Sequence, residues 1–305
     1  MSELVPDPFR RQFQAVAHDP EAPSAAEWVS RLPRLLDALL GDWDLRPDGA
    51  TRWGWRALVV PVVSPAGPAA LKVGWPHPGA RHEHLALRHW AGGGTVRLLR
   101  ADPTRDALLL ERLDPERDLR TIPAPEAGTV LGRLLRDLRR PAPPQLSTTA
   151  AYAARLAGDL TGDVPGIPRR FVEQARSLAA DLAADGERNH PMWLLHTDLR
   201  EANVLAAQRS PWLAIDPEPL AGDRAFEVAR ALRERIGEAD RAGSVRAAIR
   251  ERFDLVCEQA EIDPDRAQAW TILREVADAR AAARAGRADD EQVRRVVTVL
   301  KAMNP

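Results

Sequence analysis

Two aspartates and an asparagine in the second half of the chain have the types and spacing to do chemistry. Asn203 follows Asp198 by five positions, and Asp216 comes thirteen residues later. Short apolar runs lie beside each of them, and runs this short favour strands over helices. A hairpin of residues 204–207 and 212–215 would hold Asn203 at its entry and Asp216 at its exit. With Asp198 on the preceding loop, the three side chains are predicted to converge.

Carboxylate and carboxamide oxygens suit a hard cation such as Mg²⁺, which keeps part of its water shell and binds phosphates. They suit zinc poorly, because zinc prefers sulfur and imidazole. Taken one at a time, Asp198, Asn203 and Asp216 also have an ordinary interpretation as turn residues. Their joint spacing favours the metal and phosphate interpretation.

The surrounding motif adds a family resemblance. His196-x-Asp198 with Asn203 five residues later resembles the catalytic loop of kinases. Together with Trp-Leu-Ala-Ile-Asp-Pro at 212–217, it resembles the aminoglycoside/hydroxyurea phosphotransferase family. The likeness extends from about residue 43 to 270, and further similar segments lie at 70–73, 83–90, 96–99 and 107–113.

The resemblance implies roles for the loop residues in phosphoryl transfer from ATP. Asp198 would orient the acceptor hydroxyl and take its proton, and Arg200 would contact the transferring phosphoryl group. Asn203 and Asp216 would hold Mg²⁺ across the phosphates. His196 would anchor the loop rather than take part in catalysis.

Lysine is rare in this chain, which makes Lys72 in the first half notable. Of the 43 basic residues only Lys72 and Lys301 are lysines, and Lys72 lies in the strand-like run Ala69-Ala-Leu-Lys-Val. A lysine at a sheet edge with its head in water is the ordinary alternative. We favour a compact ammonium that binds the nucleotide phosphates.

Other nucleotide-site candidates depend on the kinase arrangement. Glu83 opens a short helix and is the expected partner of Lys72, although an acid in a first helical turn is also favoured by the helix dipole. Thr51, within the segment 47–54, is a candidate phosphate donor. Glu111 and Leu113 are positional candidates for the hinge that binds the adenine edge.

The acceptor site is expected to be acidic if the acceptor is a cation. Candidate acids are Glu218, Asp223, Glu227 and Glu201, each with the alternative of a helix cap or a solvated charge. We expect transfer of the γ-phosphate to a hydroxyl of a small molecule, for example an aminoglycoside or aminocyclitol antibiotic such as streptomycin. The alternatives are a metabolic sugar or amino-alcohol kinase and a nucleotide-binding pseudokinase without turnover.

Composition bounds the partners. The chain has 305 residues, a formal net charge of −1 and mixed charges, which does not indicate a nucleic-acid partner. Cys257 is its one cysteine, so no internal disulfide forms. The N-terminus lacks signal-peptide features, and no apolar run is long enough for a membrane span. We expect a cytoplasmic monomer or weak dimer without a membrane partner.

The predicted fold is α+β and bilobal, like protein kinases, with the active site between the lobes. Residues 1–112 would form an N-terminal arm and helix and then a small antiparallel sheet with one inserted helix. Residues 113–305 would form a larger, mainly helical lobe that holds the catalytic loop. The arm at 1–20 is expected to be loosely packed. Helices are predicted at 24–40, 79–90, 126–138, 148–160, 168–184, 225–236, 242–261, 264–284 and 290–303, and N-terminal strands at 43–46, 53–63, 69–73, 95–100 and 107–113.

Overall fold

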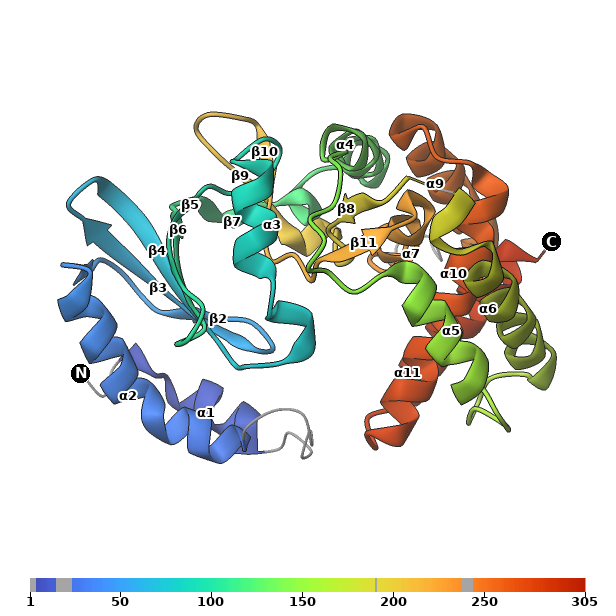
Figure 1. Ribbon diagram of the computed structural model, residues 1–305, viewed down its shortest axis with the longest axis horizontal. Coiled ribbons are helices and arrows are strands. Elements are labelled where there is room, and N and C mark those ends of the chain that lie inside the picture. The colour runs from blue at the N-terminus through green and yellow to red at the C-terminus, as the bar shows by residue number, and fades with distance from the viewer. Residues whose placement is uncertain (1–3, 15–23, 190, 237–243, 305) are drawn as a thin grey trace. The chain divides into compact units, whose positions relative to one another are not determined.

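The computed structural model describes residues 4–14, 24–189, 191–236 and 244–304. The chain divides into two compact units, Met1–Asp114 and Pro115–Pro305 (Figure 1). The sequence predicts a boundary between residues 112 and 113. Antiparallel sheets and helices occur in both units, so the fold class is α+β, as predicted.

Unit 1 is built on an antiparallel sheet with the strand order β1-β3-β4-β6-β5, and β2 also pairs with β3. In β3, Leu58, Val60 and Val62 alternate with more exposed residues, so one face of the strand is apolar. The strands are β1 (Arg46–Pro47), β2 (Arg52–Trp53), β3 (Ala57–Ser64), β4 (Gly67–Gly74), β5 (Leu98–Asp102) and β6 (Ala107–Glu111).

Two helices, α1 (Asp7–Gln14) and α2 (Ala25–Asp42), cover the apolar face of this sheet (Figure 1). Leu32 and Leu36 of α2 belong to the same buried cluster as the β3 residues. The proline at position 8 is compatible with helix α1. Pro8 lies in the first turn, where a backbone N–H would have no acceptor within the helix, so its absence costs no hydrogen bond.

The prediction of a loose N-terminal arm is wrong for α1. Phe9 and Phe13, one helical turn apart, are both fully buried. Phe9 meets Trp28 edge-on at a ring-centroid distance of 5.9 Å, and Phe13 meets it in a tilted arrangement at 5.0 Å. Residues 15–20 of that arm lie outside the described residues. The predicted strand at 43–46 is also shorter than expected, since Trp43 ends α2 and pairing starts at Arg46.

The inserted helix of unit 1 is α3 (Glu83–Trp90), which follows a short 3₁₀ turn, Pro78–Ala80. Ala86, Leu87 and Trp90 are buried on its inner side. Ala91, in the left-handed conformation with φ 51°, ends the helix. Glu83 is therefore fixed in the first turn of a helix that is anchored by apolar packing.

Unit 2 carries two small sheets among helices. The predicted hairpin is present: β9 (Val204–Ala206) pairs antiparallel with β10 (Trp212–Ala214), and β7 (Asp114–Asp118) adds to β9. The second sheet pairs β8 (Trp193–Leu195) with β11 (Leu220–Gly222). The segment that the sequence predicts to be a catalytic loop thus runs from the end of β8 to the start of β9.

The helices of unit 2 lie close to their predicted positions, with one exception. They are α4 (Ala124–Asp137), α5 (Thr149–Asp159), α6 (Arg169–Asn189), α7 (Val228–Ala231), α9 (Val245–Ala260), α10 (Pro264–Arg284) and α11 (Asp290–Met303). The predicted helix 225–236 is instead a 3₁₀ turn, Arg224–Glu227, and the short α7. Regular helix cannot continue there, because Arg235 has φ 58°. Residues 242 and 243 lie outside the described residues.

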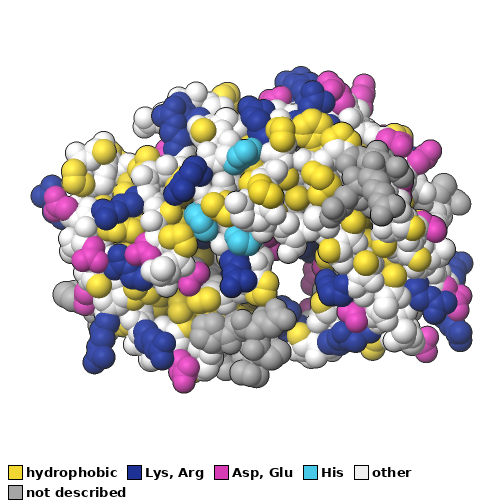
Figure 2. All heavy atoms as spheres, in the orientation of Figure 1, with side chains coloured by type: hydrophobic (Ala, Val, Ile, Leu, Met, Phe, Trp, Pro, Cys, Tyr) yellow, Lys and Arg dark blue, Asp and Glu magenta, His cyan; other side chains and the backbone are white. Residues whose placement is uncertain are grey.

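Charge on the surface is mixed, as the composition predicts. On the face shown in Figure 2, Lys or Arg and Asp or Glu side chains are interspersed. Among the residues that the structure describes, no helix combines the length and the hydropathy that a membrane crossing requires.

Candidate active site

The segment after β8 is tied to the end of β10 by two hydrogen bonds. The ring nitrogen Nε2 of His196 lies 3.0 Å from the carbonyl oxygen of Ile215, and the Ile215 N–H donates to the carbonyl of Asn203 at 2.9 Å. Asp216 directly follows Ile215. The backbone therefore brings Asp216 to the two ends of the loop that carries Asp198 and Asn203.

Asp198 and Asn203 are in direct contact. The Nδ2 of Asn203 donates to Oδ2 of Asp198 at 2.8 Å and to the Asp198 carbonyl at 2.9 Å. Asn203 is buried at the end of the 3₁₀ turn Glu201–Asn203, so its orientation is fixed. Both hydrogen bonds use the nitrogen, which leaves the carboxamide oxygen as the atom suited to a cation.

Backbone strain is concentrated at two residues of this site. Thr197, which precedes Asp198, has φ 59°, and Asp216 has φ 61°. Non-glycine residues seldom adopt this left-handed conformation, and such residues cluster at functional sites. Thr197 is held by several bonds: its hydroxyl donates to the Glu218 carbonyl at 2.5 Å, and its carbonyl accepts from Arg274 at 3.0 Å.

His196 is fully buried beneath the site. Burial lowers its pKa, while the negative charges of Asp198 and Asp216 act in the opposite direction. Both carboxylates therefore lie within electrostatic range of one imidazole ring. The low pKa favours neutral imidazole, which agrees with an anchoring role.

Two arginines face the carboxylate of Asp198. Arg230 Nε lies 3.3 Å from Oδ1, and Arg200 Nε lies 3.4 Å from Oδ2. Burial raises the pKa of Asp198, and the positive charges of Arg230 and Arg200 oppose that rise. Arg200 is held in turn by Glu234, whose Oε1 is 2.9 Å from Nη1. The sequence predicts Arg200 as a site residue. It does not predict Arg230 or Glu234, because both lie in the predicted helix 225–236 and belong to no motif.

Glu227 supports the loop from inside the protein. Its two carboxylate oxygens accept the N–H groups of His196 at 2.5 Å and Thr197 at 2.9 Å. Burial raises its pKa to about 7, against the effect of these two hydrogen bonds. The prediction that Glu227 contacts the acceptor is therefore wrong, because its oxygens are bonded to the loop backbone.

Glu201 and Asp223 are also structural, contrary to prediction. Glu201 is 1% exposed and pairs with Arg235 at 2.6 Å. Asp223 caps the turn at 224–227 through the Ala225 N–H, and accepts the indole N–H of Trp270 at 2.7 Å as well as an Arg266 hydrogen bond. Desolvation makes unpaired buried acids costly, so these partners explain both side chains.

Glu218 keeps its candidacy for the acceptor. Its side chain belongs to a half-buried residue, and its charge is among those that raise the pKa of Asp198. Its backbone N–H donates to the His196 carbonyl at 3.0 Å. Glu218 is therefore the predicted acceptor acid that lies beside Asp198.

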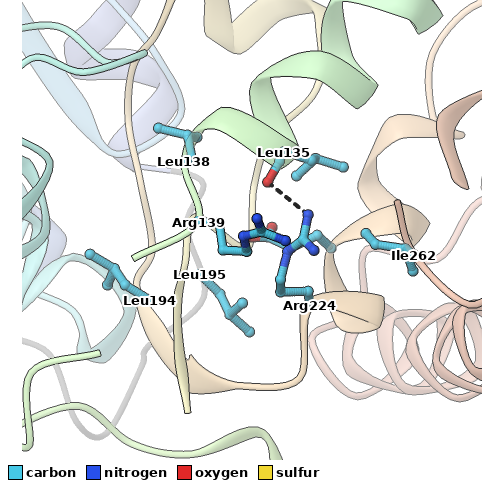
Figure 3. A pocket seen from close by; sticks show the side chains of 8 residues that line it. Leu135, Leu138, Arg139, Leu194, Leu195, Arg224 and Ile262 are labelled. Atoms are coloured by element: carbon cyan, nitrogen blue, oxygen red, sulfur yellow. Dashed lines mark hydrogen bonds between the residues drawn. The ribbon is translucent and has the colours of Figure 1, made fainter. Parts of the chain in front are cut away.

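A cavity at the end of β8, beside Glu227, is too small for a substrate. It has a volume of about 10 Å³, which matches a single water molecule. Figure 3 shows Arg224, whose Nη2 donates to the Leu135 carbonyl at 3.3 Å, among the residues that line it. The lining residues are Leu135, Leu138, Arg139, Leu194, Leu195, Arg224, Glu227 and Ile262. The lining of this cavity includes Glu227 but not Asp198.

Unit 1 contains the predicted pair of Lys72 and Glu83. The ammonium of Lys72, on β4, lies 2.7 Å from both carboxylate oxygens of Glu83, in the first turn of α3. The two side chains are only 10% and 6% exposed. The ion pair fixes the ammonium on the strand, which is the geometry that phosphate binding by a strand lysine requires.

The remaining nucleotide candidates occupy the same unit. Thr51 stands before β2, while the turn that joins β2 to β3 is at residues 54–56, closed by the Gly54 N–H to the Ala57 carbonyl at 3.0 Å. Thr51 is thus outside the turn. Glu111 ends β6 and accepts the Arg97 N–H at 3.1 Å, and Leu113 lies two residues beyond it.

These features define a class of protein. Kinase-like phosphotransferases are characterised by a sheet with a lysine–glutamate ion pair in one unit and, in the other, a loop with Asp198 and Asn203 that is followed by Asp216 after a hairpin. Solved structures show the same fold: aminoglycoside phosphotransferase APH(4)-Ia matches with a TM-score of 0.58 at 17% identity, over 89% of this chain and 99% of its own. Choline kinase LicA from Streptococcus pneumoniae matches with a TM-score of 0.59 at 11% identity, over 90% and 99%.

The chain belongs to the aminoglycoside/hydroxyurea antibiotic resistance kinase family, whose model matches residues 42–286. It is 39% identical to streptomycin 6-kinase of Streptomyces griseus over 81% of each chain. It is 41% identical to hydroxyurea phosphotransferase of Kitasatospora aureofaciens, over 82% of this chain and 73% of that protein. The family resemblance is thereby confirmed, and the protein is a phosphotransferase that acts on hydroxyl groups.

Proposed function

We propose that this protein uses ATP and Mg²⁺ to phosphorylate a hydroxyl group of a streptomycin-type aminocyclitol antibiotic. The observation that carries the proposal is the contact of Asn203 with Asp198, tied through Ile215 to Asp216. This arrangement supplies a base and cation-binding oxygens side by side. Asp198 orients the acceptor hydroxyl and accepts its proton, while Arg200 neutralises charge on the transferring phosphoryl group.

Lys72 and Glu83 serve the nucleotide in this proposal. Lys72 binds the α- and β-phosphates, and Glu83 keeps the ammonium in place before the nucleotide arrives. Such preorganisation lowers the cost of binding, because the lysine side chain has already lost its rotamer freedom. Thr51, Glu111 and Leu113 remain candidates for the phosphate and adenine contacts.

The residues present fit a magnesium ion. Among the described residues no group of three or more His, Cys, Asp or Glu has an arrangement for a metal. Magnesium in kinases needs no such group, since it takes one or two protein oxygens and completes its shell with phosphates and water. The Asn203 carboxamide oxygen and the Asp216 carboxylate are those ligands in our proposal. When bound, the ion supplies charge neutralisation across the phosphates.

Two observations support streptomycin as the acceptor: the names of two relatives and the position of Glu218. Streptomycin 6-kinase is the name of two relatives at 39% and 37% identity. Streptomycin is a cation, and Glu218 lies where a carboxylate would favour a cation near Asp198. A second candidate acceptor is hydroxyurea, favoured by the 41% identity to hydroxyurea phosphotransferase. We further propose a cytoplasmic location and a monomer or weak dimer.

An acceptor panel tests this function. ADP release is measured with the full chain, ATP and Mg²⁺, in the presence of streptomycin, hydroxyurea or choline, and without acceptor. We expect turnover with streptomycin well above the acceptor-free rate, and none with choline. Turnover with hydroxyurea alone would favour the second candidate. Nucleotide binding without turnover in any arm would favour the pseudokinase alternative.

A further inference from the structure

Arg230 contacts three oxygen atoms that come from two separate segments. Its Nε–H donates to the carbonyl oxygen of Thr197 at 3.3 Å, and the same Nε lies 3.3 Å from Oδ1 of Asp198 in an ion pair. Its Nη1 lies 3.2 Å from Oδ2 of Asp278, on α10. The Arg230 side chain is 15% exposed. A guanidinium with acceptors on opposite ends has little rotational freedom, because its donors form a rigid planar fork.

Asp278 belongs to a chain of ion pairs in which acids of α10 alternate with arginines. It also pairs with Arg233, which in turn pairs with Glu275 at 3.4 Å. Glu275 is completely buried and receives a second arginine, Arg295, at 2.9 Å. The far end of the Arg230 guanidinium is therefore attached to an acid of α10 that has a second arginine partner.

The two oxygens of Asp198 have different partners. Oδ2 accepts from Asn203 at 2.8 Å and faces Arg200 at 3.4 Å, whereas Oδ1 faces Arg230. Hydrogen bonds on Oδ2 and the ion pair on Oδ1 together restrict rotation of the carboxylate about its final bond, which is otherwise a soft torsion. The orientation of that plane decides where an acceptor hydroxyl can hydrogen-bond.

We infer that Arg230, held by Asp278, is a positioning residue that fixes the carboxylate plane of Asp198 for the acceptor hydroxyl. This inference rests on the proposed function, because it takes Asp198 as the residue that receives the hydroxyl. Arg230 touches neither nucleotide nor acceptor in this account and acts by holding Asp198, directly and through the carbonyl of the neighbouring Thr197. Misplacement of a catalytic group by a fraction of an ångström lowers turnover without weakening substrate binding to the same degree.

The chain offers a matched control. Arg233 pairs with the same Asp278 but has no contact with Asp198 among its ion pairs and hydrogen bonds in the described residues. Arg230→Met and Arg233→Met each remove one arginine partner of Asp278. Only the first removes the link to Asp198. Asp278→Asn leaves Arg230 in place and weakens its anchor, so it serves as a second variant if Arg230→Met folds poorly.

The kinetic test uses streptomycin as acceptor with saturating ATP and Mg²⁺. We expect Arg230→Met to lower kcat about 100-fold, with KM for both substrates changed less than about threefold, and Asp278→Asn to lower kcat about tenfold. Arg233→Met should stay within about threefold of the parent. In an Asp198→Asn background, Arg230→Met should cause no further loss, because a residue that acts through Asp198 cannot add to its removal. A further loss of kcat when Arg230→Met is added to Asp198→Asn would overturn the inference. An equal loss of kcat in Arg230→Met and Arg233→Met would overturn it as well.

A second measurement does not depend on turnover. Hydrogen–deuterium exchange of the peptide that spans residues 194–204 should be faster in Arg230→Met than in the parent, and unchanged in Arg233→Met. If the parent turns over neither streptomycin nor hydroxyurea, the proposed function fails, and the exchange result alone decides whether Arg230 holds the loop. Unchanged exchange in Arg230→Met would overturn the inference in either case.

Discussion

The Nδ2 of Asn203 lies 2.8 Å from Oδ2 of Asp198, so the proposed magnesium ligand and the proposed base are one hydrogen-bonded unit. The same carboxamide also binds the Asp198 backbone carbonyl. A change in either side chain will therefore affect the other. Predictions for this pair must separate loss of chemistry from loss of geometry.

Asp198→Ala is expected to lower kcat by several orders of magnitude while ATP affinity persists, because the nucleotide contacts proposed here do not include Asp198. Turnover is measured by ADP release, and affinity by calorimetric titration. Asp159→Ala, which removes the exposed acid of the Arg155 ion pair, is the control and should be silent. An active Asp198→Ala protein would remove Asp198 from the mechanism.

Asp216→Ala should abolish the magnesium-dependent part of ATP binding, since it removes one of two proposed protein ligands of the ion. Its exposed side chain contributes little to stability, but its φ of 61° predicts a loss of about 1 kcal/mol, because alanine adopts the left-handed conformation less readily than aspartate does. Titrations with ATP in Mg²⁺ and in EDTA make the comparison. Equal magnesium dependence in variant and parent would contradict the assignment.

Glu83→Gln should both destabilise unit 1 and raise KM for ATP. Loss of one member of a buried ion pair costs about 3–5 kcal/mol, because Lys72 is left without its compensating charge. Asp42→Asn is the control, as it breaks an exposed pair with Arg105 that is worth less than about 1 kcal/mol. Urea unfolding measures the stability of both variants, and ADP release at varied ATP concentration measures KM. Similar losses in the two variants would argue against a special Lys72–Glu83 pair.

Glu227 makes stability depend on pH. Its pKa is about 7 in the folded protein, against an ordinary value of 4.5, so between these values the folded state holds a proton that the unfolded state has released. Its contribution is thus complete below about pH 4.5 and is lost as the pH rises to about 7. The loss amounts to about 3 kcal/mol. The free energy of unfolding of the parent should fall by that amount between pH 4 and 8 relative to Glu227→Gln. Parallel pH profiles would contradict the burial of this acid.

A pair of glycines tests the helix packing of unit 2. A Cβ at Gly132, in α4, would lie 2.5 Å from the Gln259 Cβ of α9, whereas a Cβ at Gly158, in α5, would meet nothing within 4 Å. Gly132→Ala should therefore destabilise the protein by about 1–3 kcal/mol. Gly158→Ala should be neutral or stabilise by up to about 1 kcal/mol. Thermal unfolding compares the two, and equal shifts would refute the close approach of α4 and α9.

The sequence predicted the parts of the site that lie in local patterns. Asp198, Asn203 and Asp216 are placed by short strands and a hairpin, and alternating or apolar runs identify these elements directly. Lys72 was found because lysine is rare in this chain, and Glu83 because it opens a helix. Their ion pair joins neighbouring elements only eleven residues apart.

The contacts that hold the loop were not predictable in the same way. Glu227 and Arg230 lie in a segment that resembled one helix, and their partners at 196–198 and 278 are distant in sequence. Nothing in local periodicity distinguishes an acid that binds loop N–H groups from one that contacts a substrate. The buried α1 was missed for a related reason, because its two phenylalanines are explained only by their packing on Trp28.

Mass spectrometry of the acceptor tests the central claim most directly. Streptomycin is incubated with ATP and Mg²⁺ in the presence of equal amounts of the parent protein or Asp198→Asn. The account predicts streptomycin phosphate and ADP in equal amounts from the parent, and almost no product from the variant. ATP hydrolysis without a phosphorylated acceptor, or equal product from both proteins, would contradict it.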